Sequence, residues 1–281
     1  MVKFKLIKVT QILNPTSINL GDYVINPYKG CQYGCLYCYV KQNKTVQNKE
    51  KGWGSYVEVK INAKEILEKE LRIKKPQTVL LGSITECFQP IEEKYKITYN
   101  ILKILNKYGV FYYILTRSPY IQKYIDLFSE GFCKKIYFTI NNIPEELRTK
   151  LENKSPSYEE RFKAIEKLKK ANIEVIPYYS PILPFVSEVK DIFKRFHNIK
   201  HIEFEGLNFK VTNIKAIIDN ISSLYPAIKA LYERMLLDKQ YYETYWQKVK
   251  ELITKEARKN KKELRLYIYK FNAYFNNIYS K

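Results

Sequence analysis

Three cysteines lie within eight positions near the N-terminus: Cys31, Cys35 and Cys38, in the stretch NPYKGCQYGCLYCYV. The chain of 281 residues has only five cysteines, and an odd, clustered set does not suit a framework of structural disulfides. Three thiolates at this spacing can converge on one point from a loop that wraps around it. The spacing therefore predicts a metal or a redox cofactor in a reducing compartment.

The number of thiolates leaves the identity of the metal open. Structural zinc sites usually have four protein ligands. Here the fourth would have to come from a distant residue, either Cys87, Cys133, His197 or His201. A [4Fe–4S] cluster also normally takes four cysteines. Three cysteines would leave one iron without a protein ligand, and a small molecule could bind that iron and exchange electrons with it.

The hydrophobic pattern indicates which elements position these cysteines. Short apolar or aromatic runs alternate with stretches of helical periodicity, and a helix after each strand is typical of a parallel sheet. The expected strands are residues 22–26, 78–84, 110–116, 135–140, 173–179 and 200–206. Six such units predict an α/β fold, a partial (β/α)6 barrel of the TIM type, whose first strand leads into the cysteines.

The pattern changes after residue 206, where three apolar stripes at helical spacing follow one another. We therefore expect a lead-in over residues 1–21, the barrel over residues 22–206 and a mostly helical extension over residues 207–281. Within the barrel, Ser157 and Glu160 have the spacing of a capping box at a helix start. The segment ELRLYIYKFNAYFNNIY fits a helix through Leu264, Tyr267, Ile268, Phe271 and Phe275, or a strand at its start.

The cysteine spacing C-x3-C-x2-C, with the aromatic Tyr37 before the last cysteine, resembles the signature of the radical SAM superfamily. Three further segments resemble the spore photoproduct lyase-like, or DNA repair photolyase-like, branch and occur in its order: GSITECFQPIEEKYKIT, ILTRS and LENKSPSYEERFKAIEKLKKANIEVIPYYSPILP. The resemblance covers residues 22–206. It implies a [4Fe–4S] cluster on Cys31, Cys35 and Cys38, with S-adenosylmethionine on the open iron. Reductive cleavage would give a 5′-deoxyadenosyl radical that takes a hydrogen atom from the substrate.

The resemblance also implies cofactor-binding residues at the carboxyl ends of the strands, where ligands of parallel α/β folds gather. Thr85 and Glu86 would contact the methionine amino group, and Arg117 the methionine carboxylate. The remaining contacts would come from Thr139 and Asn141, to the ribose or the carboxylate, and from the Tyr37 backbone, to the adenine. The alternative for Glu86 and Arg117 is an ordinary surface ion pair.

Cys87 departs from the branch pattern, which usually has proline at this position. In spore photoproduct lyase a cysteine near this strand end donates a hydrogen atom to the product radical, but that position falls nearer Ser83 here. Thymine-dimer repair by that scheme is therefore not implied. Cys87 is the candidate catalytic residue, as a displaced hydrogen donor or a thiol that faces the substrate, and its alternative is a packed small residue.

The charge of the chain bears on its partner. Lys and Arg number 49 against 29 Asp and Glu, a net charge of +20, and 26 tyrosines are partly interleaved with basic residues. Such a balance favours a polyanion, and aromatic faces stack on exposed bases. We therefore expect a nucleic-acid substrate, DNA rather than RNA, that is repaired or modified. The alternatives are a small-molecule or protein substrate, with the charge set by coding bias, and a non-catalytic iron–sulfur or zinc protein that binds nucleic acid.

No apolar run approaches the roughly 20 residues that span a bilayer, and MVKFKLIKVT has no apolar signal-peptide region. We expect a cytoplasmic monomer that does not bind membranes and that receives single electrons from an unidentified reductant.

Overall fold

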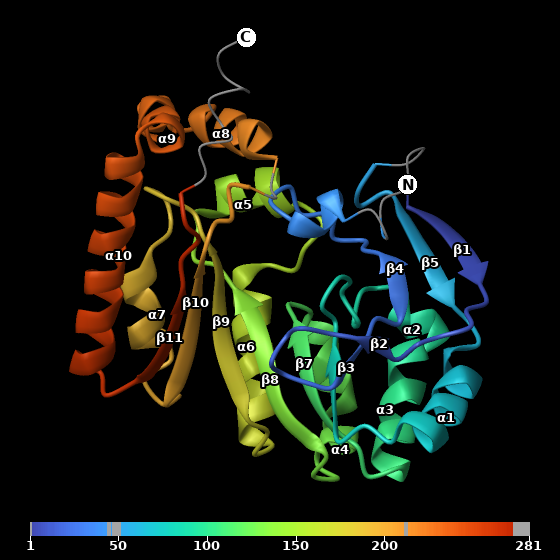
Figure 1. Cartoon of the computed structure of the whole chain (residues 1–281). Helices are drawn as coiled ribbons and strands as arrows, with labels where there is room; N and C mark the ends of the chain where they lie inside the picture. Colours follow the sequence, from blue (N-terminus) through green and yellow to red (C-terminus); the bar gives the residue numbers. More distant parts are fainter. Residues whose placement is uncertain (1, 44–45, 47–51, 211–212, 272–281) are drawn as a thin grey trace. The chain divides into compact units, whose positions relative to one another are not determined.

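The structure, a computed structural model, describes residues 2–43, 46, 52–210 and 213–271. The chain divides into two compact units, and Figure 1 labels the helices and strands that they contain. The first unit contains Met1–Gly34, Asn43–Thr139 and Lys154–Ile176, and the second contains Cys35–Gln42, Ile140–Asn153 and Pro177–Lys281.

Parallel strands form the core of the first unit. The strands β3 (Tyr23–Ile25), β6 (Thr78–Leu81), β7 (Phe111–Thr116) and β8 (Cys133–Ile140) pair in that order, and the short β2 (Asn14–Pro15) pairs antiparallel with β3. Their continuous apolar runs are buried on both faces, as in Val79, Leu80 and Leu81, which are inaccessible to solvent. The helices are α1 (Ala63–Lys74), α3 (Ile97–Lys107) and α6 (Tyr158–Lys170), with the short α2 (Glu92–Tyr95), η2 (Pro119–Tyr124) and α4 (Ile125–Phe128).

A second, three-stranded sheet in the first unit is formed by strands from both sides of the cysteine segment in the sequence. Its order is β1 (Lys3–Ile7), β5 (Tyr56–Lys60) and β4 (Tyr28–Gly30). Strand β1 lies in the expected lead-in and pairs parallel with β5, and β4 pairs antiparallel with the other edge of β5. Because β4 ends at Gly30, this sheet determines where Cys31 begins its loop.

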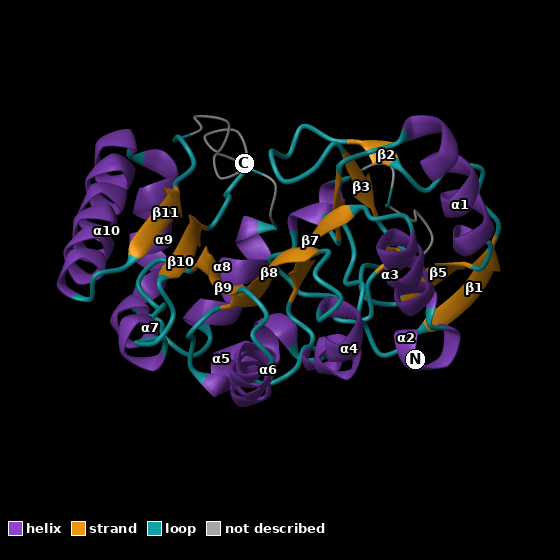
Figure 2. Ribbon diagram, turned by 90° about the horizontal axis from the view of Figure 1, so that it is seen from below, coloured by secondary structure: helices purple, strands orange, loops and turns teal. Residues whose placement is uncertain are grey.

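The second unit has a parallel set of strands and most of the later helices. Strand β10 (His201–Gly206) pairs with β9 (Val175–Ile182) on one side and with β11 (Glu263–Tyr267) on the other. The helices are η1 (Tyr39–Gln42), α5 (Glu145–Glu152), α7 (Val189–Arg195), α8 (Ile214–Ser222), α9 (Ile228–Leu237) and α10 (Lys239–Lys259). Helix α10 runs alongside β11, as Figure 2 shows. No helix of the described ranges is both long and apolar enough to cross a membrane.

The six predicted strands are confirmed as β3 and β6 to β10. The predicted capping box is also confirmed, because the Ser157 hydroxyl accepts from the Glu160 amide at 3.2 Å and the Glu160 carboxylate accepts from the Ser157 amide at 2.7 Å. The helix alternative for the last segment is wrong over Glu263–Tyr267, where alternate residues are exposed and the backbone pairs with β10. Phe275, which that alternative also used, lies outside the described residues.

Candidate active site

The loop that carries the cysteines begins at Gly30, the last residue of β4. Gly30 has φ of +90°, and a Cβ there would lie 2.5 Å from the carbonyl oxygen of Tyr56, so only glycine fits. The Gly30 carbonyl accepts a hydrogen bond of 2.6 Å from the Thr85 hydroxyl, which ties the loop to the end of β6. Cys31 follows directly and is 9% exposed.

Cys35 and Cys38 lie on one tight turn of the second unit. The Cys38 amide donates to the Cys35 carbonyl at 3.2 Å, and the Lys41 amide donates to the Cys38 carbonyl at 3.3 Å. Cys35 is buried and Cys38 is half-buried. Burial lowers the pKa of Lys41 below its usual value, and the negative charge that Cys38 and Cys35 carry as thiolates acts in the opposite direction. A cation therefore lies beside two of the predicted cluster ligands.

The donor set fits an iron–sulfur cluster by its chemistry. The three cysteines form no disulfide, and thiolates are the protein ligands that such clusters take. The described part of the chain contains no group of three or more His, Cys, Asp or Glu side chains that could hold a metal ion. The assignment of the cluster to Cys31, Cys35 and Cys38 therefore stays a prediction from donor type, spacing and loop geometry.

Glu86 lies in the loop after β6 and is 7% exposed. Its Oε1 accepts from the Phe88 amide at 3.0 Å and from the Thr116 hydroxyl at 2.7 Å. Its Oε2 accepts from the Arg117 amide at 2.9 Å. Burial raises the pKa of the carboxyl group, and these hydrogen bonds together with the Arg117 charge act in the opposite direction. The structure thus brings the predicted residues Glu86 and Arg117 together, with Glu86 buried and Arg117 half-buried, so Glu86 is not an exposed surface carboxylate. The roles of both residues toward the cofactor stay predictions.

The end of β7 is also tied to the cysteine loop. The Ser118 hydroxyl donates to the Phe88 carbonyl at 2.6 Å and accepts from the Tyr33 hydroxyl at 2.8 Å. Tyr33 stands between the first two cysteines in the sequence, and it is 4% exposed. The Arg117 side chain, half-buried, therefore projects from a backbone that is fixed on both sides. Thr139, predicted for the same cofactor, is half-buried near the end of β8.

Tyr37 and Asn141, two predicted cofactor-binding residues of the second unit, contact each other. The Asn141 side-chain amide donates to the Tyr37 hydroxyl at 3.2 Å, and the two residues are 2% and 5% exposed. The residue that follows β8 thereby holds the turn that carries Cys35 and Cys38. The predicted contacts of these residues with the adenosine part of the cofactor stay predictions.

Cys87 is fully buried. A Cβ added to Gly82 would lie 3.2 Å from its sulfur, and its carbonyl accepts from the Thr98 hydroxyl at 2.6 Å. Burial raises the pKa of the thiol well above its usual value, so the sulfur is protonated at neutral pH. This environment favours the packed alternative, and the catalytic role of Cys87 stays a prediction.

The sequence did not reveal the role of Glu92, a buried carboxylate that supports the cysteine loop through its hydrogen bonds. It is inaccessible to solvent and accepts from two tyrosine hydroxyls, Tyr28 and Tyr124, the latter at 2.7 Å. It also accepts from the amides of Thr98 and Tyr99, both at 3.0 Å. Since Tyr28 belongs to β4, Glu92 links the strand before Cys31 to the start of α3.

Two further hydrogen bonds that the sequence did not reveal join the cysteine loop to the segment before α2. The Gln32 amide donates to the Gln89 side-chain oxygen at 2.8 Å, and the Gln32 side-chain oxygen accepts from the Ile91 amide at 2.6 Å. Gln89 and Glu92 both belong to the FQPIE part of the segment whose resemblance was noted from the sequence. That resemblance was the available signal for these residues, but it indicated contacts with the cofactor and not hydrogen bonds to the cysteine loop.

The family model for the Radical SAM superfamily matches residues 25–196, more than half of the chain. The chain belongs to the radical SAM superfamily. Radical SAM enzymes use a [4Fe–4S] cluster and S-adenosylmethionine, so the predicted enzyme class and cofactors are confirmed at the level of the family. An uncharacterized protein of Methanocaldococcus jannaschii is 36% identical over 210 residues, which cover 73% of this chain and 78% of that protein. An uncharacterized protein of Mycobacterium bovis is 25% identical over 173 residues, which cover 59% of this chain and 51% of that protein.

Solved structures of radical SAM proteins share the fold. Spore photoproduct lyase in complex with dinucleoside spore photoproduct matches 94% of this chain and 81% of its own, with a TM-score of 0.65 and 14% identity. SuiB of Streptococcus suis, bound to S-adenosylmethionine, matches 91% of this chain and 48% of its own, with a TM-score of 0.52 and 9% identity. Likeness at these identities confirms the radical SAM partial barrel with its mostly parallel strands and helices.

Proposed function

We propose that this radical SAM enzyme abstracts a hydrogen atom from a nucleic acid, DNA in preference to RNA, and so repairs or modifies a base. The observation that carries the proposal is the likeness, over 94% of this chain, to the fold of spore photoproduct lyase in complex with a dinucleoside photoproduct. The net charge of +20 supports it, because basic proteins gain affinity for nucleic acid by releasing counterions.

In this proposal Cys31, Cys35 and Cys38 hold the cluster. When bound, the cluster and S-adenosylmethionine supply a one-electron reduction that gives methionine and a carbon radical able to take hydrogen from a C–H bond. Glu86 accepts from the methionine ammonium group with the lone pairs that its three chain donors leave open, and Arg117 donates to the methionine carboxylate. The Glu86 carboxylate is fixed without the cofactor by its three donors, and one of these bonds also holds the backbone from which the Arg117 side chain projects.

The remaining parts of the proposal concern the other cofactor contacts, the location of the protein and its electron donor. Thr85 contributes only as an acceptor, since its hydroxyl hydrogen is committed to the Gly30 carbonyl. Thr139, Asn141 and the Tyr37 backbone complete the contacts to the nucleoside part. The protein acts as a cytoplasmic monomer and receives its electron from a separate one-electron donor.

An anaerobic turnover assay tests the proposal. The protein is reconstituted with iron and sulfide, reduced with dithionite and given S-adenosylmethionine, and 5′-deoxyadenosine is quantified with single-stranded DNA, duplex DNA, RNA, inorganic polyphosphate or no polyanion. We expect product that requires Cys35, tested as Cys35→Ala, and that DNA raises more than polyphosphate does.

Each other outcome has a defined meaning. Product that is indifferent to every nucleic acid contradicts the proposed substrate and favours the alternative of a small molecule or a protein. Equal stimulation by polyphosphate shows that only the charge of the polymer matters. Product that appears with RNA alone retains the chemistry but overturns the preference for DNA. The remaining alternative from the sequence, a non-catalytic metalloprotein, is not supported by membership of the superfamily.

A further inference from the structure

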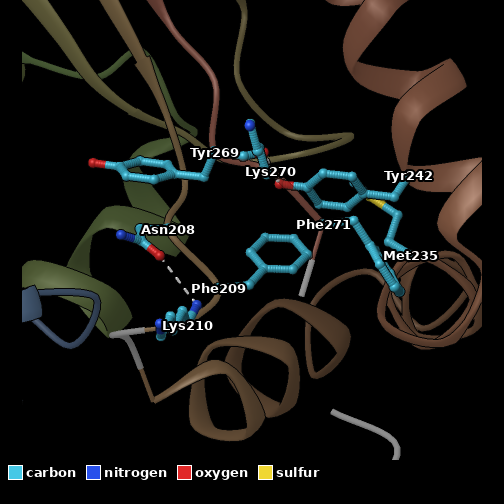
Figure 3. Close-up of a pocket in the computed structure, with 8 residues that line it drawn as sticks. All are labelled: Asn208, Phe209, Lys210, Met235, Tyr242, Tyr269, Lys270 and Phe271. Carbon is cyan, nitrogen blue, oxygen red and sulfur yellow. Dashed lines mark hydrogen bonds between the residues drawn. The ribbon is translucent and has the colours of Figure 1, made fainter. Parts of the chain in front are cut away.

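A cavity of about 320 Å³ opens in the second unit, between the ends of two strands and the helices α9 and α10 (Figure 3). It is lined by residues 208–210, by Met235 and Tyr242, and by residues 269–271. The first of these segments follows β10 and the last follows β11, and the two strands are parallel neighbours. The cavity therefore lies at the carboxyl ends of the strands, where α/β folds bind their ligands.

The inner wall of this pocket is aromatic and apolar. Tyr242 packs edge-on against Phe209 and Phe271, with ring centroids 5.8 and 5.6 Å apart. Met235, Tyr242 and Phe209 are almost fully buried, while Phe271 is half-buried. The Tyr242 hydroxyl donates to the Tyr269 carbonyl at 2.7 Å, which fixes the segment after β11 against α10. Phe271 therefore offers part of its ring to a ligand on a wall that is already packed.

The rim of the pocket is polar and basic. Lys210 and Lys270 are exposed, and the Asn208 side chain accepts from the Lys210 amide at 3.1 Å and hydrogen bonds to the Tyr269 hydroxyl. Tyr269 in turn donates to the carboxylate of Glu205, near the end of β10. An aromatic ring on an apolar wall, a carboxamide and two ammonium groups match the base and the phosphates of a nucleotide.

The size and place of the pocket narrow the ligand further. Its volume is at the lower end of the range of about 300–1,000 Å³ typical of small-molecule sites, which suits one base rather than a duplex. Glu205, the acceptor of Tyr269, lies close enough to Tyr39 for the two groups to interact electrostatically. Tyr39 directly follows Cys38 in the same unit, so the pocket residue Tyr269 is connected through Glu205 to the turn that carries Cys38.

We infer that this pocket binds one unpaired base of the substrate strand by stacking on Phe271, with Lys210 and Lys270 on the neighbouring phosphates. The inference rests on the proposed function and names the feature of the nucleic acid that the protein recognises. A base held in this way must first leave its duplex or belong to a single strand.

Binding of short oligonucleotides to the cluster-loaded protein tests the inference without any turnover. Fluorescence anisotropy compares an eight-nucleotide oligothymidylate with an abasic strand of the same length, under anaerobic conditions. Phe271→Ala is expected to weaken binding of oligothymidylate by about 5- to 150-fold, the usual effect of losing one stacked base. Binding of the abasic strand should not change. The matched control is Tyr267→Ala, which removes another aromatic ring, 50% exposed, from the same segment but outside the pocket.

The lysines give an independent measurement. Lys210→Gln with Lys270→Gln should weaken binding of both strands and reduce the dependence of log K on log salt by about 1.4, since each single-strand phosphate contact contributes about 0.7. The control pair is Lys248→Gln with Lys255→Gln on the exposed surface of α10, which has the same charge change and should leave the slope unaltered.

Several outcomes overturn the inference. If Phe271→Ala weakens both strands equally, or neither, the pocket does not take a base. Phe271→Leu keeps much of the apolar volume but has no ring. An equal loss in Phe271→Leu and Phe271→Ala, with unchanged thermal unfolding, shows that the ring itself matters, whereas full recovery of oligothymidylate binding by leucine shows that stacking does not carry the contact. If the wild-type protein binds no oligonucleotide, the proposed function fails as well. If DNA stimulates turnover but Phe271→Ala binds oligothymidylate as tightly as the wild type, only the inference about this pocket is contradicted.

Discussion

The substitution Glu86→Gln separates the role of this carboxylate in cofactor binding from its role in the fold. Glutamine keeps the shape and one acceptor oxygen. That oxygen can still accept from the Phe88 amide and the Thr116 hydroxyl, which both contact Oε1 in the wild type. The amide NH2 group then occupies the place of Oε2 and faces the Arg117 amide, which is itself a donor.

Two magnitudes follow from this arrangement. The Arg117 amide loses its acceptor, and a buried donor without a partner costs about 1–3 kcal/mol in the free energy of unfolding. A methionine ammonium group would lose a charge-assisted hydrogen bond worth about 1.5–3 kcal/mol. The affinity for S-adenosylmethionine should therefore fall by about 10- to 150-fold. Loading of the cluster should be unchanged, because Glu86 has no bond to the cysteine loop among the contacts described above.

Equilibrium dialysis of the cofactor against protein of equal iron content measures the first effect, and urea unfolding measures the second. The matched control is Thr116→Val. It removes one donor to Glu86 and leaves the Ser118 amide, which donates to the Thr116 hydroxyl at 3.0 Å, without its acceptor. It should therefore lower the stability to a similar extent but leave the cofactor affinity as it is. If Glu86→Gln binds the cofactor as tightly as the wild type, Glu86 only supports the Arg117 backbone and the reasoning is refuted.

Three further predictions concern buried and capping side chains. Ser157→Ala should lower the free energy of unfolding by about 0.5–2 kcal/mol in urea titrations, because α6 loses its cap. The control Ser129→Ala, which changes an exposed serine at a helix end, should alter the free energy of unfolding by less than about 0.5 kcal/mol. Equal effects of the two substitutions would contradict the capping role of Ser157. Burial lowers the pKa of Lys60 from 10.5 to about 8, so the unfolded chain binds more protons between these values. The stability of the wild type relative to Lys60→Met should therefore rise as the pH rises from about 8 to about 10.5 in unfolding titrations, and a flat difference would refute the shift. Cys87→Ala should cost about 1 kcal/mol as a small cavity and leave the yield and identity of the turnover products unchanged, and an altered product would instead identify Cys87 as the hydrogen donor.

The parallel strands could be predicted because their signal is local. Residues 79–81 and 110–115 are continuous runs of apolar and aromatic residues, which is how a strand covered on both faces appears in a sequence. The capping box is local in the same way. The sheet of β1, β5 and β4 could not be predicted, because β4 has three residues, one of them glycine, and its existence depends on pairing with a segment almost thirty residues away.

The same distinction applies to the site. The cysteines are close in the sequence, so their spacing alone indicated a cluster. Glu92 is different, because its four donors come from β4, the start of α3 and the end of η2. Neither glutamate in FQPIEE carries any sign of these partners in the sequence, and only the fold brings them together around Glu92.

The segment after β6 resembled its branch in a way that first indicated cofactor contacts, yet most of its side chains bind the protein itself. Thr85 donates to Gly30, Gln89 accepts from Gln32, and Glu92 accepts from Tyr28. Each of these partners lies within four residues of Cys31, the first predicted cluster ligand. A motif can therefore be shared among relatives because it holds the cysteine loop in place, whereas Glu86, which bonds to the end of β7 instead, has a geometry suited to the cofactor. Substitutions at Thr85, Gln89 or Glu92 should consequently be judged by cluster content, and substitutions at Glu86 by affinity for S-adenosylmethionine.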